Sequence, residues 1–503
     1  MTSPGTEVRA VATADALTRP VLTYMRFKTI TLALILLALF PAAGQASTKQ
    51  LTIFQADQQI VGVTQAARDA TLAELRALGV DAIKIQLTWS EVAPRTARKP
   101  AGFDGSDPAD YPGFPAFATA VADAQAAGFR VMLALSPSVP GFATKARGDE
   151  VGVDRPSTTE FGRFAEAAGR RFPSVDLWTL WNEPNHPGFL FPQTTKARVP
   201  YSPRLYRSLI RSGVAGLKRS GHGGQRILFG ELLPIGKRNL FRKNTMQPIR
   251  FLRELFCLDS RWRAYRGRSA RLRGCDGYRK ITGVNGFAYH PYTRPAGPLS
   301  KEPTPDDATI RSYGRITRAL DIARRKGRIG GGRLRVWNTE FDFQSDPPDN
   351  IFGAKLSRIP DFMSRSEWIA YRNPRVASHA QYQLLDTPIF EPTDRGLWQG
   401  GLRFADGRMK PGVYAAYRLP LFVRLLGPST VEVWGAARPG GRGATVQIQS
   451  RLGGGAYGNL RSLTVKNVRG YYKARVKVSR AAKRRFRASS AGHVSWVTKA
   501  VSR

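Results

Sequence analysis

Eight short apolar runs recur along residues 50–420, and segments with the periodicity of amphipathic helices separate them. The runs are rich in β-branched and aromatic residues, as buried strands are. They lie at 52–55, 82–88, 130–135, 175–181, 226–229, 281–289, 334–337 and 376–385. Strands that alternate with helices indicate a parallel sheet, and eight such units fit a closed (β/α)8 TIM barrel. The competing fold is an open, doubly wound sheet, but no glycine-rich phosphate loop follows the first run.

The pattern changes after Leu426. Residues 431–500 contain short alternating runs separated by Gly, Pro and Asn, and these runs show no clear helical period. Regularly spaced short strands of this kind are typical of a small antiparallel β-sandwich. The sequence therefore predicts an α/β barrel domain at 47–425 followed by a β-sandwich accessory domain at 426–503.

The first 46 residues have the layout of a secretory signal peptide. A basic stretch at 25–28 precedes an apolar segment of 11 residues at 30–40, and Gly-Gln-Ala at 44–46 precedes Ser47 as a cleavage site would. Such a segment is too short to span a bilayer comfortably, although a buried N-terminal helix is the alternative. Residues 1–24 do not resemble an export element, which favours translation from Met25. We expect a secreted protein, extracellular or associated with the cell wall, without a transmembrane segment after cleavage.

The chain is strongly basic, with 78 Lys and Arg against 37 Asp and Glu and a formal net charge of +41. This excess attracts polyanions such as nucleic acid, anionic cell-wall polymers or acidic polysaccharide, or it simply decorates a solvated surface. No nucleic-acid-binding motif accompanies the charge, so we expect no specific nucleic-acid partner. We expect a monomer whose basic surface can bind anionic cell-wall polymers.

The chain has only two cysteines, Cys257 and Cys275, on either side of a basic insertion. In an oxidising compartment they predict one disulfide. The five histidines show no metal-ligand spacing, and the chain has neither a phosphate-binding loop nor a nucleophile elbow. We therefore expect no metal and no cofactor.

Two glutamates follow strand-like runs at the end where (β/α)8 enzymes carry their active sites. Glu183 follows the run 175–181 within Trp-Asn-Glu-Pro-Asn, and Glu340 follows the run 334–337 within Trp-Asn-Thr-Glu-Phe. Carboxylates held about 5 to 5.5 Å apart across a barrel mouth can cleave a glycosidic bond with retention of configuration. Taken singly, each glutamate could instead be an exposed acid or the partner of an arginine.

Aromatic and histidine side chains near other strand ends are candidates for substrate binding. The Tyr292 hydroxyl could donate to a Glu340 carboxylate, and His290, two positions earlier, could face the same side and bind a sugar hydroxyl. A structural role in a Pro-containing turn is the alternative. Trp89 and Trp398 could stack on sugar rings, although a place in the core is as consistent with the sequence.

A further acid, Glu231, ends the run 226–229. It could bind a sugar hydroxyl or form a salt bridge with an arginine, and we favour the salt bridge.

The two glutamate motifs carry a resemblance to a known superfamily. Residues 181–185, Trp-Asn-Glu-Pro-Asn, resemble the fourth-strand motif of the clan A glycoside hydrolases, the cellulase-like (β/α)8 superfamily, and residues 337–341 resemble its seventh-strand motif. The resemblance extends over most of residues 50–420, and the segment 406–411 is similar to a turn of secreted bacterial members. It implies that Glu183 is the general acid/base and Glu340 the nucleophile. It also implies that Asn182 binds the sugar 2-hydroxyl.

Two positions depart from the superfamily pattern. Residues 136–140 read Ser-Pro-Ser-Val-Pro where members often carry His or Trp, and Asp342 stands where a glycine is common. The sequence thus predicts a retaining glycosidase that cleaves β-linked oligo- or polysaccharides. The alternative is a non-catalytic barrel that binds cell-wall polymers or other polyanions.

Overall fold

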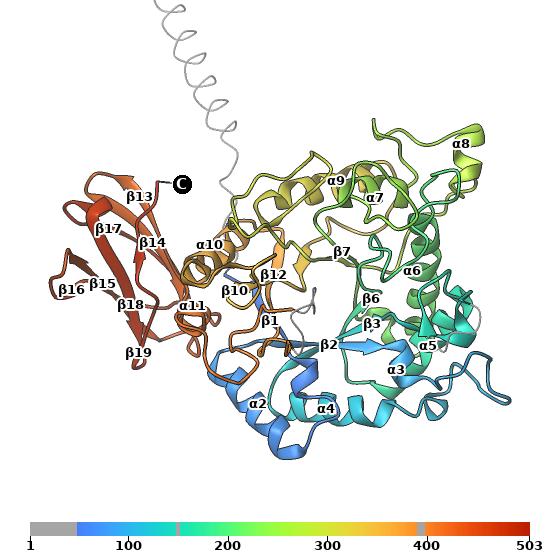
Figure 1. The fold of residues 1–503 in the computed structure, drawn as a ribbon, viewed down its shortest axis with the longest axis horizontal. Coiled ribbons are helices and arrows are strands. Elements are labelled where there is room, and N and C mark those ends of the chain that lie inside the picture. The colour runs from blue at the N-terminus through green and yellow to red at the C-terminus, as the bar shows by residue number, and fades with distance from the viewer. Residues whose placement is uncertain (1–47, 147–150, 390–397, 503) are drawn as a thin grey trace, which may run out of the picture. The chain divides into compact units, whose positions relative to one another are not determined.

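The computed structural model describes residues 48–146, 151–389 and 398–502, and eight parallel strands form a closed barrel in it (Figure 1). Around the barrel the order is β1-β12-β9-β8-β7-β6-β3-β2. The strands are β1 (Leu51–Gln55), β2 (Ala82–Thr88), β3 (Arg130–Ser136), β6 (Leu177–Leu180), β7 (Arg226–Leu232), β8 (Gly286–Tyr289), β9 (Val336–Asn338) and β12 (Val376–Tyr382). Each lies in or overlaps one of the eight predicted runs, so the (β/α)8 barrel is confirmed.

The predicted signal peptide lies outside the described residues and stays a prediction. Within 48–146, 151–389 and 398–502, no helix combines the length and the apolar character that a membrane span requires.

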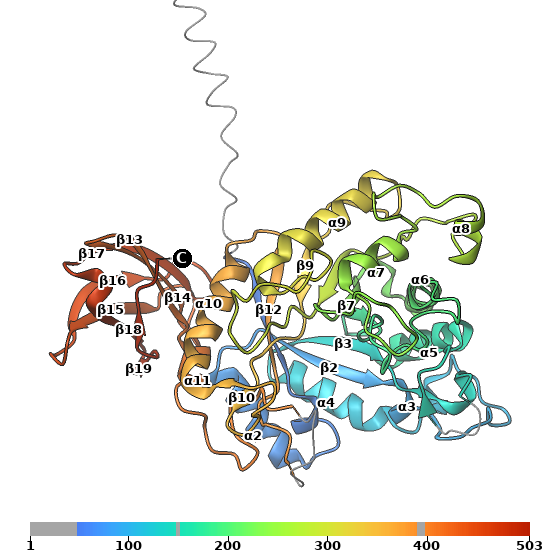
Figure 2. The same ribbon diagram turned by 45° about the horizontal axis from the view of Figure 1, so that its top comes forward.

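Helices surround the barrel, as the turned view in Figure 2 shows. They are α2 (Gln65–Ala77), α3 (Trp89–Val92), α4 (Phe114–Ala126), α5 (Thr158–Arg171), α6 (Ser202–Arg219), α7 (Pro248–Leu255), α8 (Gly267–Leu272), α9 (Tyr313–Arg325), α10 (Ile359–Tyr371) and α11 (Val413–Arg418). The α5 helix starts at Ser157, whose hydroxyl accepts from the Glu160 N–H at 3.3 Å, as an N-cap does. The α6 helix packs closely against α5, since Gly216 has no side chain. A Cβ at this position would lie 2.1 Å from the Gly162 carbonyl oxygen. This close pair packs outside β6, the strand that leads to Glu183.

The interior of the barrel is filled by side chains from successive strands. Ile53, Met132, Leu177, Leu228 and Trp337 belong to this inner apolar cluster, and each is buried. A second, larger apolar cluster lies between the strands and the helices. The barrel interior is thus largely a packed apolar core, and most polar side chains gather towards the carboxyl ends of the strands.

The C-terminal part of the chain consists of two antiparallel sheets. One has the order β13-β14-β17 and the other β16-β15-β18-β19, with β20 paired to β18. The strands are β13 (Leu421–Gly427), β14 (Thr430–Ala436), β15 (Thr445–Leu452), β16 (Gly458–Thr464), β17 (Tyr471–Lys477), β18 (Arg484–Ser490), β19 (His493–Val494) and β20 (Thr498–Lys499). Side chains from both sheets form one apolar core, so the predicted β-rich domain is confirmed. Its first strand, β13, begins at Leu421, inside the range that the sequence assigns to the barrel.

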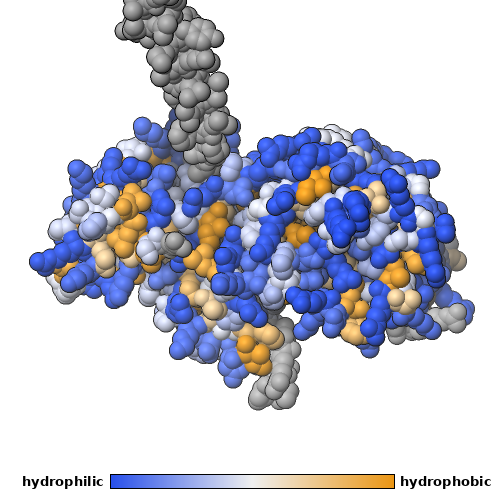
Figure 3. Space-filling model, turned by 90° about the horizontal axis from the view of Figure 1, so that it is seen from above, coloured by the Kyte–Doolittle hydropathy of each residue, from blue (hydrophilic) through white to orange (hydrophobic). Residues whose placement is uncertain are grey.

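The first of these sheets packs on α10 of the barrel domain. Trp368 and Tyr371 of α10 form an apolar cluster with Phe422, Trp434 and Tyr471 of the sheet. On the face seen in Figure 3, hydrophilic residues predominate and hydrophobic ones form small separate groups, as the high net charge leads one to expect.

Cys257 and Cys275 form the predicted disulfide, which closes a segment that contains α8 and six arginines. We expect the double variant Cys257→Ser/Cys275→Ser to lower the free energy of unfolding by about 3 kcal/mol, because the cross-link limits the unfolded chain. Urea unfolding of both proteins measures the difference. A change below about 1 kcal/mol would show that the bond contributes little beyond local order.

Candidate active site

Glu183 and Glu340 emerge at the carboxyl ends of β6 and β9. Between β6 and Glu183 the backbone leaves the extended region, with φ of 73° at Trp181 and 41° at Glu183. Positive φ is unfavourable for residues other than glycine and persists where surrounding contacts fix it. Two contacts do so here, since the Trp181 N–H donates to the Leu135 carbonyl at 2.9 Å and the Glu183 N–H to the Glu231 carbonyl at 3.0 Å. The neighbouring strands thus aim Glu183 into the barrel mouth.

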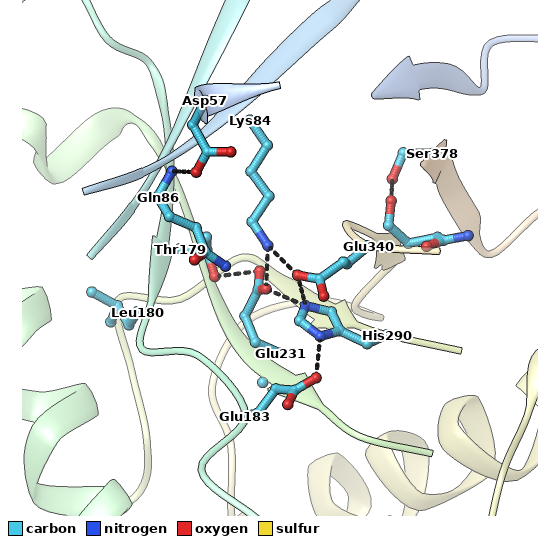
Figure 4. Close-up of polar contacts among 12 residues, drawn as sticks. Asp57, Lys84, Gln86, Thr179, Leu180, Glu183, Glu231, His290, Glu340 and Ser378 are labelled. Atoms are coloured by element: carbon cyan, nitrogen blue, oxygen red, sulfur yellow. Dashed lines mark hydrogen bonds and ion pairs between the residues drawn. The ribbon is translucent and has the colours of Figure 1, made fainter. Parts of the chain in front are cut away.

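His290, at the end of β8, connects three carboxylates (Figure 4). Its Nδ1 lies 2.9 Å from Glu183 Oε1, its Nε2 hydrogen-bonds Glu231 Oε2, and its Nε2 lies 3.6 Å from Glu340 Oε2. Burial alone would lower the pKa of His290, but the Glu340 and Glu231 carboxylates outweigh it and raise the pKa to about 9. At neutral pH His290 is therefore an imidazolium that donates one N–H to Glu183 and the other to Glu231.

Lys84 supplies a second cation from the middle of β2, and the sequence interpretation missed it. Its Nζ lies 2.8 Å from Glu231 Oε2 and 3.4 Å from Glu340 Oε2, and its side chain is fully buried. A lysine inside the apolar run Ala-Ile-Lys-Ile-Gln-Leu-Thr is a signal that could have revealed it, because buried lysines need a partner.

Glu231 is the carboxylate that anchors this network. It forms a salt bridge, as favoured from the sequence, but its partners are Lys84 and His290 and not an arginine. Its other oxygen accepts from the Thr179 hydroxyl at 2.9 Å. Burial would raise the pKa of Glu231, but the two cations outweigh burial and lower it to about 2. Glu231 therefore stays ionised throughout the neutral range.

Glu183 and Glu340 have different surroundings. Burial raises the pKa of Glu183 to about 7, an increase that His290 partly offsets and the Glu340 charge reinforces. Glu340 accepts from the Tyr292 hydroxyl at 2.8 Å on one oxygen and faces Lys84 on the other. One oxygen of Glu183 and one oxygen of Glu340 lie within 4.8 Å of each other. The site thus holds two nearby carboxyl groups, one of which carries a proton near neutral pH.

Asn182, Tyr292 and Trp398 lie around these carboxylates. Asn182 is buried, and among the described residues its Oδ1 has no hydrogen-bond partner. Trp398 packs edge-on against Tyr292 with ring centroids 5.1 Å apart, and its indole N–H donates to Asp342. Together Tyr292, Trp398 and Asp342 line a pocket of about 480 Å³ next to Glu340. His290, Tyr292 and Trp398 therefore converge on one site with the two glutamates, and Asn182 directly precedes Glu183 in the chain.

Trp89 does not belong to this site. It is 1% exposed and stacks on Phe164 of α5 with ring centroids 5.3 Å apart. Trp89 is the first residue of α3, and its ring belongs to the large apolar cluster between the strands and the helices. Of the two interpretations of Trp89, the structure thus supports the core residue and not the sugar-stacking one.

Glu183, His290 and Glu340 could each offer one atom to a metal ion, and these atoms lie within 4.8 Å of one another. The set suits a cation poorly. An imidazolium has no free lone pair for a metal, and the Lys84 ammonium already faces Glu340. The chemistry that this arrangement can perform is proton transfer from Glu183 and nucleophilic attack by Glu340.

No protein-family model and no curated protein sequence matches this chain. Among solved structures it is similar to an FMN-binding β-glucuronidase from Facaelibacterium prausnitzii L2-6, with 11% identity over 92% of this chain and 57% of that one (TM-score 0.40). It is also similar to GH5_18 from Bifidobacterium longum subsp. longum ATCC 55813, with 11% identity over 74% and 78% of the chains (TM-score 0.45). A third is xylanase 10B from Thermotoga petrophila RKU-1 in complex with xylobiose, with 12% identity over 73% and 93% (TM-score 0.41).

The chain spans little more than half the length of the β-glucuronidase. At identities of 11 to 12% these likenesses assign no activity to this chain, and membership of the clan A glycoside hydrolases stays a prediction.

Proposed function

We propose that this protein is a retaining glycoside hydrolase that cleaves β-linked oligo- or polysaccharides, with Glu340 as nucleophile and Glu183 as general acid/base. The observation that carries the proposal is the pair of carboxyl groups at the carboxyl ends of β6 and β9, which have contrasting surroundings and one oxygen pair within 4.8 Å. Retaining enzymes hold their carboxyl groups about 5 to 5.5 Å apart, whereas inverting enzymes need about 6.5 to 9.5 Å to admit a water. One oxygen pair within 4.8 Å is compatible with the retaining spacing.

In the first step Glu340 attacks the anomeric carbon while Glu183 gives its proton to the departing oxygen. The Tyr292 hydroxyl and the Lys84 ammonium orient Glu340. The Asn182 Oδ1, which no described residue contacts through a hydrogen bond, is available to accept from a sugar hydroxyl.

The second step uses Glu183 as a base. When Glu340 becomes a glycosyl ester it loses its charge, and the repulsion that helps to raise the pKa of Glu183 disappears. Glu183 can then remain ionised and take a proton from the water that attacks the ester. The same carboxyl group therefore serves as acid and then as base.

A screen of 4-nitrophenyl β-glycosides and of plant and bacterial β-glycans tests the proposal, with Glu183→Ala as the control. We expect release of sugar from at least one substrate class by the wild type and not by the variant. Retention on anionic cell-wall polymer without hydrolysis of any glycan would favour the non-catalytic alternative, and salt would abolish that retention.

The pH dependence of activity should follow Glu183. Its pKa of about 7 means that the acid form needed for the first step is lost as the pH rises through 7. We expect kcat/KM for an unactivated glycoside to fall about tenfold per pH unit above this value. Replacement of His290 by Asn removes a cation that lowers the pKa of Glu183, so the basic limb should move to higher pH. A basic limb that stays in place in the variant would contradict this arrangement.

A further inference from the structure

We infer that the substrate is an acidic glycan, and that an anionic group on its leaving-group side binds a basic pocket beside Glu183. This inference rests on the proposed function. The pocket, called here the loop pocket, has a volume of about 470 Å³. It lies in the two loops that follow β6 and β7, the strands that lead to Glu183 and carry Glu231. Its basic residues are Lys196, Arg198, Arg242 and Lys243.

The loop pocket is lined by four cationic side chains. None of the described residues that line it is acidic, and the loop segments 184–201 and 233–247 contain six Lys and Arg and no Asp or Glu. Asp154 pairs with Phe191 through a β-bridge, and its carboxylate already forms an ion pair with Arg155 at 2.9 Å. The Asp307 carboxylate accepts from the Gly236 N–H of the second loop at 3.0 Å. Several cations around one hollow repel each other, and an anionic ligand relieves that repulsion.

Aromatic rings hold the two arginines of the loop pocket in place. The Arg198 guanidinium lies 4.4 Å from the Phe241 ring centroid and the Arg242 guanidinium 5.2 Å from that of Phe191. An arginine that rests on a ring loses less freedom when it binds a carboxylate, sulfate or phosphate through two N–H groups. The paired arginines therefore suit a planar or tetrahedral oxyanion better than flexible lysines alone would.

A buried hydroxyl provides a further polar group. Thr194 lines the loop pocket and is fully buried, and its Oγ1 has no hydrogen-bond partner among the described residues. Buried polar groups are normally satisfied, so an unpaired hydroxyl at a pocket wall indicates a group that a ligand completes. This observation is independent of the charge.

Hydrogen bonds tie the loop pocket to the backbone next to Glu183. The Gln193 N–H donates to the Arg242 carbonyl and its side-chain amide to the Pro184 carbonyl, both at 3.1 Å. The Met246 N–H donates to the Asn185 carbonyl at 2.8 Å. The general acid faces the departing oxygen, so a pocket hydrogen-bonded to the residues next to it is a candidate site for the sugars that leave. The loop pocket is thus placed to select substrates with acidic leaving-group sugars.

Binding by the inactive Glu340→Gln protein tests this inference without the need for turnover. Four fluorescent hexamers serve as probes: β-1,4-mannuronate, sulfated cellohexaose, neutral cellohexaose and a single-stranded DNA. We compare Arg198→Gln/Arg242→Gln with Arg324→Gln/Arg325→Gln, which removes the same charge from the exposed last turn of α9. Fluorescence anisotropy at two salt concentrations gives each Kd, and circular dichroism confirms that the variants are folded.

We expect an acidic hexamer to bind at least tenfold more tightly than the neutral one. In the loop-pocket variant the ratio of the two Kd values should fall about tenfold. The α9 variant should retain it. The mannuronate and sulfated probes separate a carboxylate from a sulfate ligand. Equal binding of neutral and acidic hexamers, or an unchanged preference in the loop-pocket variant, would overturn the inference. The inference would also be overturned if the DNA bound as tightly as the acidic hexamers and lost the same affinity in the loop-pocket variant. The pocket would then be a general polyanion site.

Failure of the proposed function has a different signature. If no β-glycoside is hydrolysed by the wild type, the catalytic assignment fails, whatever the hexamers show. If the wild type hydrolyses glycosides and the loop-pocket variant keeps its preference for acidic hexamers, only the inference about the loop pocket fails.

Discussion

Replacement of Glu340 by Gln is expected to lower kcat/KM for every β-glycoside by roughly four orders of magnitude or more. The amide keeps the shape of the side chain and can still contact Tyr292 and Lys84, but it cannot form a glycosyl ester. The loss should be the same for good and poor leaving groups, since the bond to the anomeric carbon is needed in both cases. Steady-state kinetics with dinitrophenyl and methylumbelliferyl glycosides measures it.

The matched control is Glu183→Ala, which removes the acid and not the nucleophile. A dinitrophenolate leaves without a proton, so the first step should survive in this variant, whereas glycosides with poor leaving groups should lose about 10² to 10⁴ in rate. The two glutamates are thus distinguished by their leaving-group dependence. Similar kinetics for both variants on both substrates would contradict their separate roles.

Replacement of Lys84 by Met is expected to lower the free energy of unfolding by about 3 to 5 kcal/mol, because it leaves Glu231 buried with only one of its two cations. The pH dependence gives a second readout. The pKa of Glu231 is lowered from 4.5 to about 2, so its contribution to stability is present above pH 4.5 and is lost as the pH falls towards 2. In the variant this acid-sensitive contribution should shrink. Chemical unfolding between pH 3 and 7 measures both effects.

The double variant Lys84→Met/Glu231→Gln separates the charge from the packing. It removes both charges of the pair, so it should be less destabilised than Lys84→Met alone. If Lys84→Met stays within about 1 kcal/mol of the wild type, Lys84 does not offset the buried carboxylate.

The barrel could be predicted from the sequence because its strands are buried on both faces and read as continuous apolar runs. All eight runs became strands, and β2 has the predicted bounds 82–88. The start of the second domain is less visible. Strand β13 is apolar like a barrel segment, and only its antiparallel pairing with β14 assigns it to the sheet.

The site could be predicted only in part. Glu183, Glu340 and Tyr292 follow strand ends, where the barrel topology brings side chains together. The direction of a side chain within a strand or a short helix is set by tertiary packing, which local sequence does not reveal. For that reason Trp89 could not be assigned between site and core. The apolar run around Lys84 indicates a buried charge, but local sequence does not show that its partners are Glu231 and Glu340. The basic loop pocket could not be predicted either, because its charged residues come from two separate loops. In the sequence they cannot be distinguished from the many other Lys and Arg of the chain.

The most direct test of the central claim is a search for the covalent intermediate. The Glu183→Ala protein, mixed with a dinitrophenyl glycoside that the screen identifies, should accumulate a glycosyl-enzyme because hydrolysis of the ester lacks its base. Mass spectrometry of the peptides should place one added sugar on Glu340. An adduct on another residue, or turnover with inverted anomeric configuration and no adduct, would contradict the account.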